Sequence, residues 1–94
     1  MGVQPIVNYV ITLHAVFEMR RRGLDEAVIR SVLATPEQRI KVRTGRDVLQ
    51  SRVTTGQGTK QHLVRVFVDV DRSPVEVVTV YKTSNLAKYW EAET

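Results

Sequence analysis

The chain has 94 residues, no cysteine and a formal net charge of +4, and 43% of its residues are hydrophobic. This length predicts one domain, residues 1–94, and the absence of cysteine excludes disulfides, thiolate metal sites and a cysteine nucleophile. No signal-peptide pattern opens the chain, and no apolar stretch approaches the roughly 20 residues of a membrane span. A soluble, cytoplasmic protein with no membrane partner is therefore expected.

The N-terminal part of the chain is predicted to form a short strand and a helix. Ile6–Ile11 is rich in β-branched and aromatic side chains, which favours a strand. Thr12 is a suitable N-cap for a helix over Leu13–Arg22, and Gly23 is a suitable left-handed residue after its end. Helical spacing predicts a core-facing stripe on this helix, made of Leu13, Val16, Phe17, Arg20 and, beyond the helix, Leu24.

A second helix is predicted over Glu26–Ala34, with Asp25 as its N-cap and Thr35-Pro36 as its end. After it the apolar spacing changes to two, which is typical of half-buried strands. We expect strands starting at Gln38 and over Val48–Thr54, His62–Val70 and Val75–Lys82, separated by turns at Gly45–Asp47, Gly56–Thr59 and Asp71–Pro74. A short helix is expected between Ser84 and Trp90.

These elements predict an α+β fold in the order βααββββ: a helical hairpin packed on a four-stranded antiparallel sheet, with a short C-terminal helix. Strand alternation predicts a helix-covered face with Ile40, Val42, Val64, Val66, Val68, Val78 and Val80. The opposite face is then expected to show Arg39, Lys41, Arg43, Gln50, Arg52, Arg65, Thr79 and Tyr81.

The positive charge is concentrated in the middle of the chain. The segment from Glu37 to Arg65 carries a net charge of +5, and the rest of the chain sums to −1. Such a segment attracts polyanions, RNA or DNA foremost. The alternative interpretation is an ordinary solvated sheet face, on which long basic side chains are common.

The sequence has no strong catalytic motif, so the candidates for chemistry are single side chains. Histidine is a common general acid or base, which makes His14 a candidate, and Glu18 lies four residues further along the same helix. The alternative interpretation of His14 is a surface histidine. A site that joins His14 to Arg65 and Tyr81 requires His14 to reach the sheet edge, so one joint site and two separate sets both remain open.

Several segments, taken together in their order and spacing, resemble the bacterial domain-of-unknown-function 4258 family. The family pattern has an apolar strand, a threonine, a His-Ala pair and an Arg-Gly-aliphatic helix joint. The segments that carry the resemblance are Tyr9–Ala15, Met19, Arg22–Glu26, Ala34–Glu37, Val64–Val66, Val78–Lys82 and Lys88–Trp90.

The resemblance implies the fold of RelE-type toxins and barnase-like ribonucleases, and with it metal-independent RNA cleavage by attack of the ribose 2′-hydroxyl, with no cofactor. It implies catalytic roles for His14, Arg65, Tyr81 and Lys82. The RNA-binding residues would be Arg22 and Thr79, together with Lys41, Arg43 and Arg52 from the basic face. The implied partners are RNA, including RNA on the ribosome, and an inhibitory antitoxin or immunity protein.

A fold does not fix a function, so a second hypothesis stays open. The domain could be a non-catalytic regulatory module that binds protein or RNA on the same fold, or that forms a homodimer. Cleavage of RNA and toxicity on expression would separate the two hypotheses.

Overall fold

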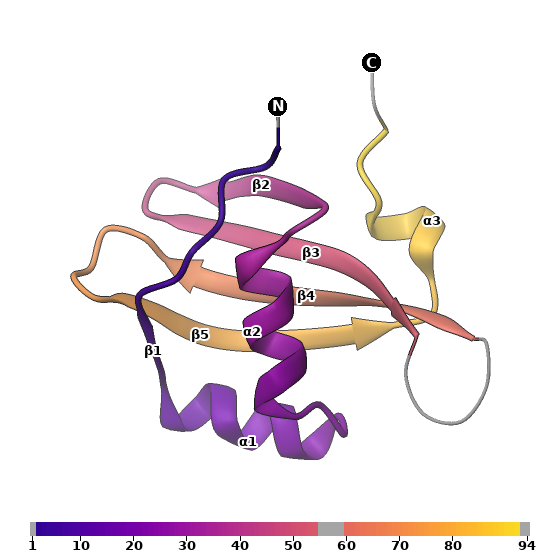
Figure 1. The fold of residues 1–94 in the computed structure, drawn as a ribbon, viewed down its shortest axis with the longest axis horizontal. Helices are drawn as coiled ribbons and strands as arrows, with labels where there is room; N and C mark the ends of the chain where they lie inside the picture. Colours follow the sequence, from indigo (N-terminus) through magenta and orange to yellow (C-terminus); the bar gives the residue numbers. More distant parts are fainter. Residues whose placement is uncertain (1, 55–59, 93–94) are drawn as a thin grey trace.

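The computed structural model describes residues 2–54 and 60–92, so the predicted turn at Gly56–Thr59 lies outside the described residues. The described part is an α+β fold with a five-stranded sheet in the order β1-β5-β4-β3-β2 (Figure 1). Its elements are β1 (Tyr9–Ile11), α1 (Leu13–Arg21), α2 (Glu26–Ala34), β2 (Gln38–Arg43), β3 (Arg46–Thr54), β4 (Gln61–Asp69), β5 (Val75–Thr83) and α3 (Leu86–Tyr89).

The prediction of a four-stranded antiparallel sheet is wrong in one respect, because β1 joins the sheet as a fifth strand. It runs parallel to β5, and Tyr9 pairs with Val75 and Ile11 with Val77. Short connections exclude parallel pairing only between strands that follow one another in the chain. β1 and β5 lie at opposite ends of the sequence, so that restriction does not apply to them. The other pairings, β2 with β3, β3 with β4 and β4 with β5, are antiparallel as predicted.

The predicted helix ends are confirmed by their hydrogen bonds. Thr12 accepts from the backbone N–H of Ala15, and Asp25 accepts from that of Val28. At the end of α1, Gly23 has φ +66°, and its N–H donates to the Arg20 carbonyl while that of Leu24 donates to Met19. This is the Schellman arrangement, which turns the chain sharply into α2. In the described parts of the chain, no helix is long and apolar enough to cross a membrane.

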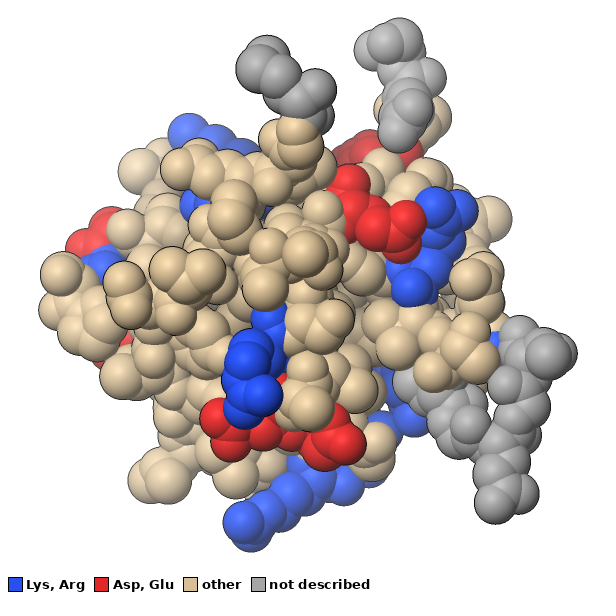
Figure 2. All heavy atoms as spheres, viewed as in Figure 1, with Lys and Arg blue, Asp and Glu red and all other residues tan. Residues whose placement is uncertain are grey.

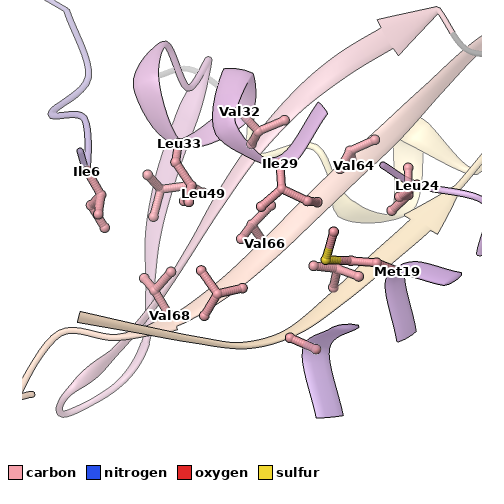
Figure 3. Close-up of a cluster of buried hydrophobic side chains, with 13 residues drawn as sticks. Ile6, Met19, Leu24, Ile29, Val32, Leu33, Leu49, Val64, Val66 and Val68 are labelled. Atoms are coloured by element: carbon pink, nitrogen blue, oxygen red, sulfur yellow. The ribbon is translucent and has the colours of Figure 1, made fainter. Parts of the chain in front are cut away.

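The main core lies between α2 and one face of the sheet. Figure 1 shows α2 crossing that face, while α1 runs alongside β5. The buried side chains that α2 contributes are Ile29, Val32 and Leu33 (Figure 3). From the sheet they meet Leu49, Val64, Val66, Val68, Val77 and Val80.

The predicted core-facing stripe of α1 is wrong. Leu13 and Phe17 are 89% and 62% exposed, whereas Ala15, Glu18 and Met19 are buried. α1 lies beside the sheet edge rather than over the sheet face, so a different side of the helix meets the protein body. Of the predicted stripe, Leu24 alone is fully in the core.

Two irregularities in the pairing shift the predicted sheet faces. Val68 pairs with Val77 and Phe67 with Thr79, so Val78 is an extra residue in β5 and Val77 takes its place in the core. In the β2–β3 hairpin, Arg39 pairs with Leu49 and Lys41 with Asp47. Directly paired residues share a face, so Arg39 and Lys41 belong to the helix side.

Ile40 therefore lies on the face opposite the helices, together with its partner Val48, and Val42 is 46% exposed. The predicted turn at Gly45–Asp47 is also displaced, because β3 already begins at Arg46. The chain turns at Gly45, which has φ +83°. A side chain there would also collide with the Asp71 carboxylate, 2.6 Å from the position of an added Cβ.

Replacing Asp69 with asparagine should flatten the loss of stability in acid. Arg46 donates two hydrogen bonds to the Asp69 carboxylate, at 2.7 and 3.1 Å, and this pairing lowers the pKa of Asp69. A carboxylate with a lowered pKa stabilises the folded state above its unfolded pKa of about 3.9, and this contribution is lost as the pH falls through the folded pKa. Urea unfolding between neutral pH and strongly acidic pH measures the effect.

The Glu91→Gln variant is the matched control, because it makes the same acid-to-amide change at an exposed position. The hydrogen bonds that join Glu91 to Gln38 use the backbone of Glu91, so they remain in this variant. Equal acid sensitivity of wild type and Asp69→Asn would contradict the assignment.

Candidate functional site

A hollow of about 360 Å³ opens on the sheet face opposite the main core, at the β5 edge. We call it the arginine–tyrosine hollow. The end of α1, the middle of β4 and β5, and α3 all contribute to it. Its lining residues are Glu18, Arg22, Arg65, Phe67, Thr79, Val80, Tyr81 and Tyr89.

Arg65 lines this hollow, and its guanidinium contacts two aromatic rings. Its guanidinium carbon is 4.6 Å from the ring centre of Tyr89 and 5.2 Å from that of Phe67. Nε donates to Gln50 Oε1 at 2.8 Å, and neither terminal amino group has a hydrogen-bond partner within the described part of the chain. Partial burial lowers the pKa of Arg65, which marks a cation separated from bulk water. The two terminal amino groups of this planar, oriented guanidinium are suited to bind an oxyanion.

Gln50 holds Arg65 in place from beneath. Its side chain is completely buried, and its amide nitrogen donates to Gln38 Oε1 at 2.7 Å and to the Tyr89 carbonyl at 3.1 Å. With both donors used, its remaining oxygen is directed at Arg65. Gln38 in turn exchanges two hydrogen bonds with the backbone of Glu91, at 2.8 and 3.2 Å. The two glutamines thus tie the C-terminal tail to the sheet and bring Tyr89 over Arg65.

A second guanidinium enters the hollow from the end of α1. Arg22 Nη2 donates to Glu18 at 3.3 Å, and its guanidinium carbon stacks 4.6 Å above the ring centre of Tyr81. Arg21 also pairs with Glu18, at 3.2 Å. Arg22 Nε is buried without a hydrogen-bond partner in the described residues, a position that normally calls for a water or a ligand. Both arginines of the hollow are therefore oriented by stacking.

Tyr81 and Tyr89 contact each other edge to face at the wall of the hollow. Their ring centres are 5.7 Å apart with the planes at 70°. Hydrogen bonding with Tyr81 lowers the pKa of the Tyr89 hydroxyl, and Lys88 and Arg65 act in the same direction. Tyr89 is therefore the tyrosine of this pair whose hydroxyl is a candidate for proton transfer.

The structure brings together four of the predicted site residues: Arg22, Arg65, Thr79 and Tyr81 all line the hollow. Lys82 does not line it, since it pairs with Val64 and shares the helix-covered face. His14 lies exposed in the first turn of α1, outside the lining but one turn ahead of Glu18 on the same side of the helix.

The predicted basic face is only partly correct. Lys41 lies on the helix side with Arg39, whose guanidinium pairs with Asp47 at 2.8 Å. Arg43 and Arg52 lie on the same sheet face as the hollow, but towards opposite ends of that face. Arg52 forms an ion pair with Glu37 at 2.7 Å and stacks over Trp90 at 4.3 Å. The basic residues thus do not form one continuous surface.

No site role was predicted from the sequence for Glu18, Gln50, Phe67 or Tyr89, although Phe67 lines the hollow beside Arg65. Glu18 was considered only as a neighbour of His14, and Gln50 only as one polar residue of a sheet face. Tyr89 was expected to pack against the body, and it does so on top of Arg65. The alternation of β3 was enough to place Gln50 on the same face as Arg65, but its burial depends on the tail that covers it.

The fold and the hollow define a small α+β domain with two stacked arginines and two tyrosines on its free sheet face. The chain belongs to the family described as a domain of unknown function, DUF4258, whose model matches residues 11–82. No curated protein and no solved structure matches the chain. The match includes every lining residue of the hollow except Tyr89, which belongs to the tail. Across residues 2–54 and 60–92, no group of three His, Cys, Asp or Glu side chains is placed to hold a metal ion.

Proposed function

We propose that the domain is a small toxin-like ribonuclease that binds RNA phosphate in the arginine–tyrosine hollow. The observation that carries the proposal is the pair of guanidinium groups, Arg22 and Arg65, oriented by tyrosine rings in one hollow. Within residues 2–54 and 60–92, the Arg65 amino groups have no hydrogen-bond partner. Arginine binds phosphate in a bidentate manner, and the rings beside it offer stacking to bases. A RelE-like relationship belongs to the same proposal. It is supported by a helical pair beside antiparallel strands and by a cationic hollow on the free sheet face.

The proposed reaction is a transesterification followed by release of the product. The ribose 2′-oxygen forms a bond to the phosphorus and loses its proton to a base, while the bond from phosphorus to the 5′-oxygen breaks and that oxygen gains a proton. The products are a 2′,3′-cyclic phosphate and a 5′-hydroxyl. Arg65 offsets the charge that develops on the phosphoryl oxygens, since fixed donors act most strongly where charge builds up.

Proton transfer is assigned to one group on α1 and to one that lines the hollow. His14, exposed on α1 one turn before Glu18, takes the 2′-proton in this proposal. Tyr89, whose pKa is lowered, donates to the leaving oxygen. Lys82 has no part in this scheme because it lies on the other face of the sheet. Such a ribonuclease would act in the cytoplasm. An inhibitory partner protein would block it by covering this hollow.

Purified protein is expected to cut single-stranded RNA in the presence of EDTA and to leave 2′,3′-cyclic phosphate ends, identified by mass spectrometry. The matched control is the same RNA carrying 2′-O-methyl groups, which keeps every phosphate but has no attacking hydroxyl. It should bind and stay intact. Cleavage of the methylated RNA would contradict the mechanism, and loss of all cleavage with EDTA would contradict metal independence.

One observation favours a second candidate, a non-catalytic RNA-binding module. The carboxylate of Glu18 inside the hollow is engaged by two arginines, and the exposed His14 does not line it. Tight, salt-sensitive binding of both the plain and the methylated RNA without any cleavage would favour this candidate.

A further inference from the structure

A large apolar surface lies on the side of α1 that does not meet the protein body. Leu13 and Phe17 are spaced one helical turn apart on α1, and Val7 and Val10 are 72% and 46% exposed on the neighbouring N-terminal segment and β1. Figure 2 shows a broad area without charged side chains over β1 and the start of α1. We call these four residues the apolar patch. Exposed patches of this kind in small proteins commonly mark interfaces.

Beside the patch lies a wide hollow of about 610 Å³ between α1, β1 and the start of α2. Its floor is apolar and includes Ile11, Val16 and Met19. Arg20 lines the hollow and lies three residues after Phe17 on α1, so the two side chains are neighbours on the helix surface and the exposed aromatic ring lies beside the apolar recess. Two copies of this surface can therefore bind each other, with the aromatic side chain of each copy in the recess of the other.

The charges around that hollow are of both signs. Arg20 lines one side, and Asp25 and Glu26 line the other. Arg20 has no ion pair among the described residues, and Glu26 reaches only Arg30, at 3.7 Å with both side chains 63% exposed. A two-fold interface uses the same surface of both subunits. Ion pairs across such an interface therefore require that each subunit carry both a positive and a negative residue on that surface. A rim of one sign would repel its own copy.

We propose that the apolar patch and this hollow form the interface of a homodimer. Phe17 of each copy enters the hollow of the other, and Arg20 of each copy faces Glu26 of the other across the two-fold axis. Glu18 and Arg22 project from a different side of α1, so the arginine–tyrosine hollow stays accessible in the dimer. The proposal does not depend on RNA cleavage.

Sedimentation equilibrium over a wide micromolar range tests the proposal. Wild type is expected to be a dimer, and Phe17→Glu a folded monomer, because Phe17 contributes mainly exposed surface. Val42→Glu is the matched control: Val42 is also exposed and apolar but lies on β2, and this variant should remain dimeric. Circular dichroism and the unfolding midpoint establish that each variant is folded.

A charge exchange tests the predicted geometry. Arg20→Glu and Glu26→Arg are each expected to weaken the dimer by about tenfold in Kd, and the double variant is expected to restore most of the loss. A wild-type monomer at every concentration would overturn the proposal. So would a Phe17→Glu protein that dimerises as well as wild type, or a double variant no better than the two single ones.

Discussion

Arg65→Gln is expected to lower kcat/KM for RNA cleavage by about 10²–10³-fold, the typical loss on removing one donor that stabilises developing charge. Glutamine cannot offer the two terminal amino groups that Arg65 directs into the hollow, and it carries no charge. Arg65→Lys should recover only part of the rate, since lysine keeps the charge but neither stacks between Phe67 and Tyr89 nor binds phosphate through two donors.

The matched control is Arg72→Gln, which removes one positive charge from the exposed turn between β4 and β5. It should leave kcat/KM close to wild type. Arg65→Gln also leaves the buried Gln50 oxygen without its donor, at a cost of about 1–3 kcal/mol. Rates are therefore compared well below the unfolding midpoint of the weaker variant. Wild-type cleavage by a folded Arg65→Gln protein would remove the arginine–tyrosine hollow from the mechanism.

Gln50→Leu is expected to lower both stability and activity. The change keeps the side-chain volume but removes the acceptor of Arg65 Nε and the donor of the Tyr89 carbonyl. Each group left buried without a partner costs about 1–3 kcal/mol, so the free energy of unfolding should fall by at least about 2 kcal/mol. Freed from Gln50, Arg65 no longer holds one orientation, and we expect the loss in kcat to exceed the change in KM.

Gln38→Leu separates the two functions of the glutamine pair. This variant loses the contacts of Gln38 with Gln50 and Glu91 but leaves the bond between Gln50 and Arg65 in place. It should loosen the tail at Glu91, while Gln50 still donates to the Tyr89 carbonyl and keeps Tyr89 at the hollow, so most of the catalytic rate per folded molecule should remain. If Gln50→Leu and Gln38→Leu reduced kcat equally, Gln50 would have no specific effect on Arg65.

Local signals in the sequence were enough to predict the helices and most of the strands. Thr12, Asp25 and Gly23 specify helix ends through hydrogen bonds within a few residues, and α2 begins and ends where predicted. The alternation of β4 also predicted its core face correctly. Such signals act over short distances and do not depend on the rest of the fold.

The predictions that were wrong concern features that depend on contacts between distant segments. The apolar stripe of α1 was assigned to the core because its spacing is helical, but spacing does not tell which side of a helix meets the body. The extra residue Val78 and the pairing of Arg39 with Leu49 shift whole faces, and no local feature of the sequence marks either of them. The same holds for the hollow. Strand alternation was enough to predict Arg65 and Tyr81 on one sheet face, where they pair directly, whereas Glu18 and Tyr89 come from other elements.

The parallel pairing of β1 with β5 has a consequence for the protein while it is being made. β1 leaves the ribosome long before its partner strand exists, and at roughly 5–20 residues per second the interval lasts several seconds. β5 also carries Thr79 and Tyr81, and Tyr89 follows it. Neither the strand that receives β1 nor the wall of the arginine–tyrosine hollow can form before β5 and α3 have been synthesised. In a growing chain, Arg22 and Arg65 are therefore made well before the residues of β5 and α3 that complete the hollow around them.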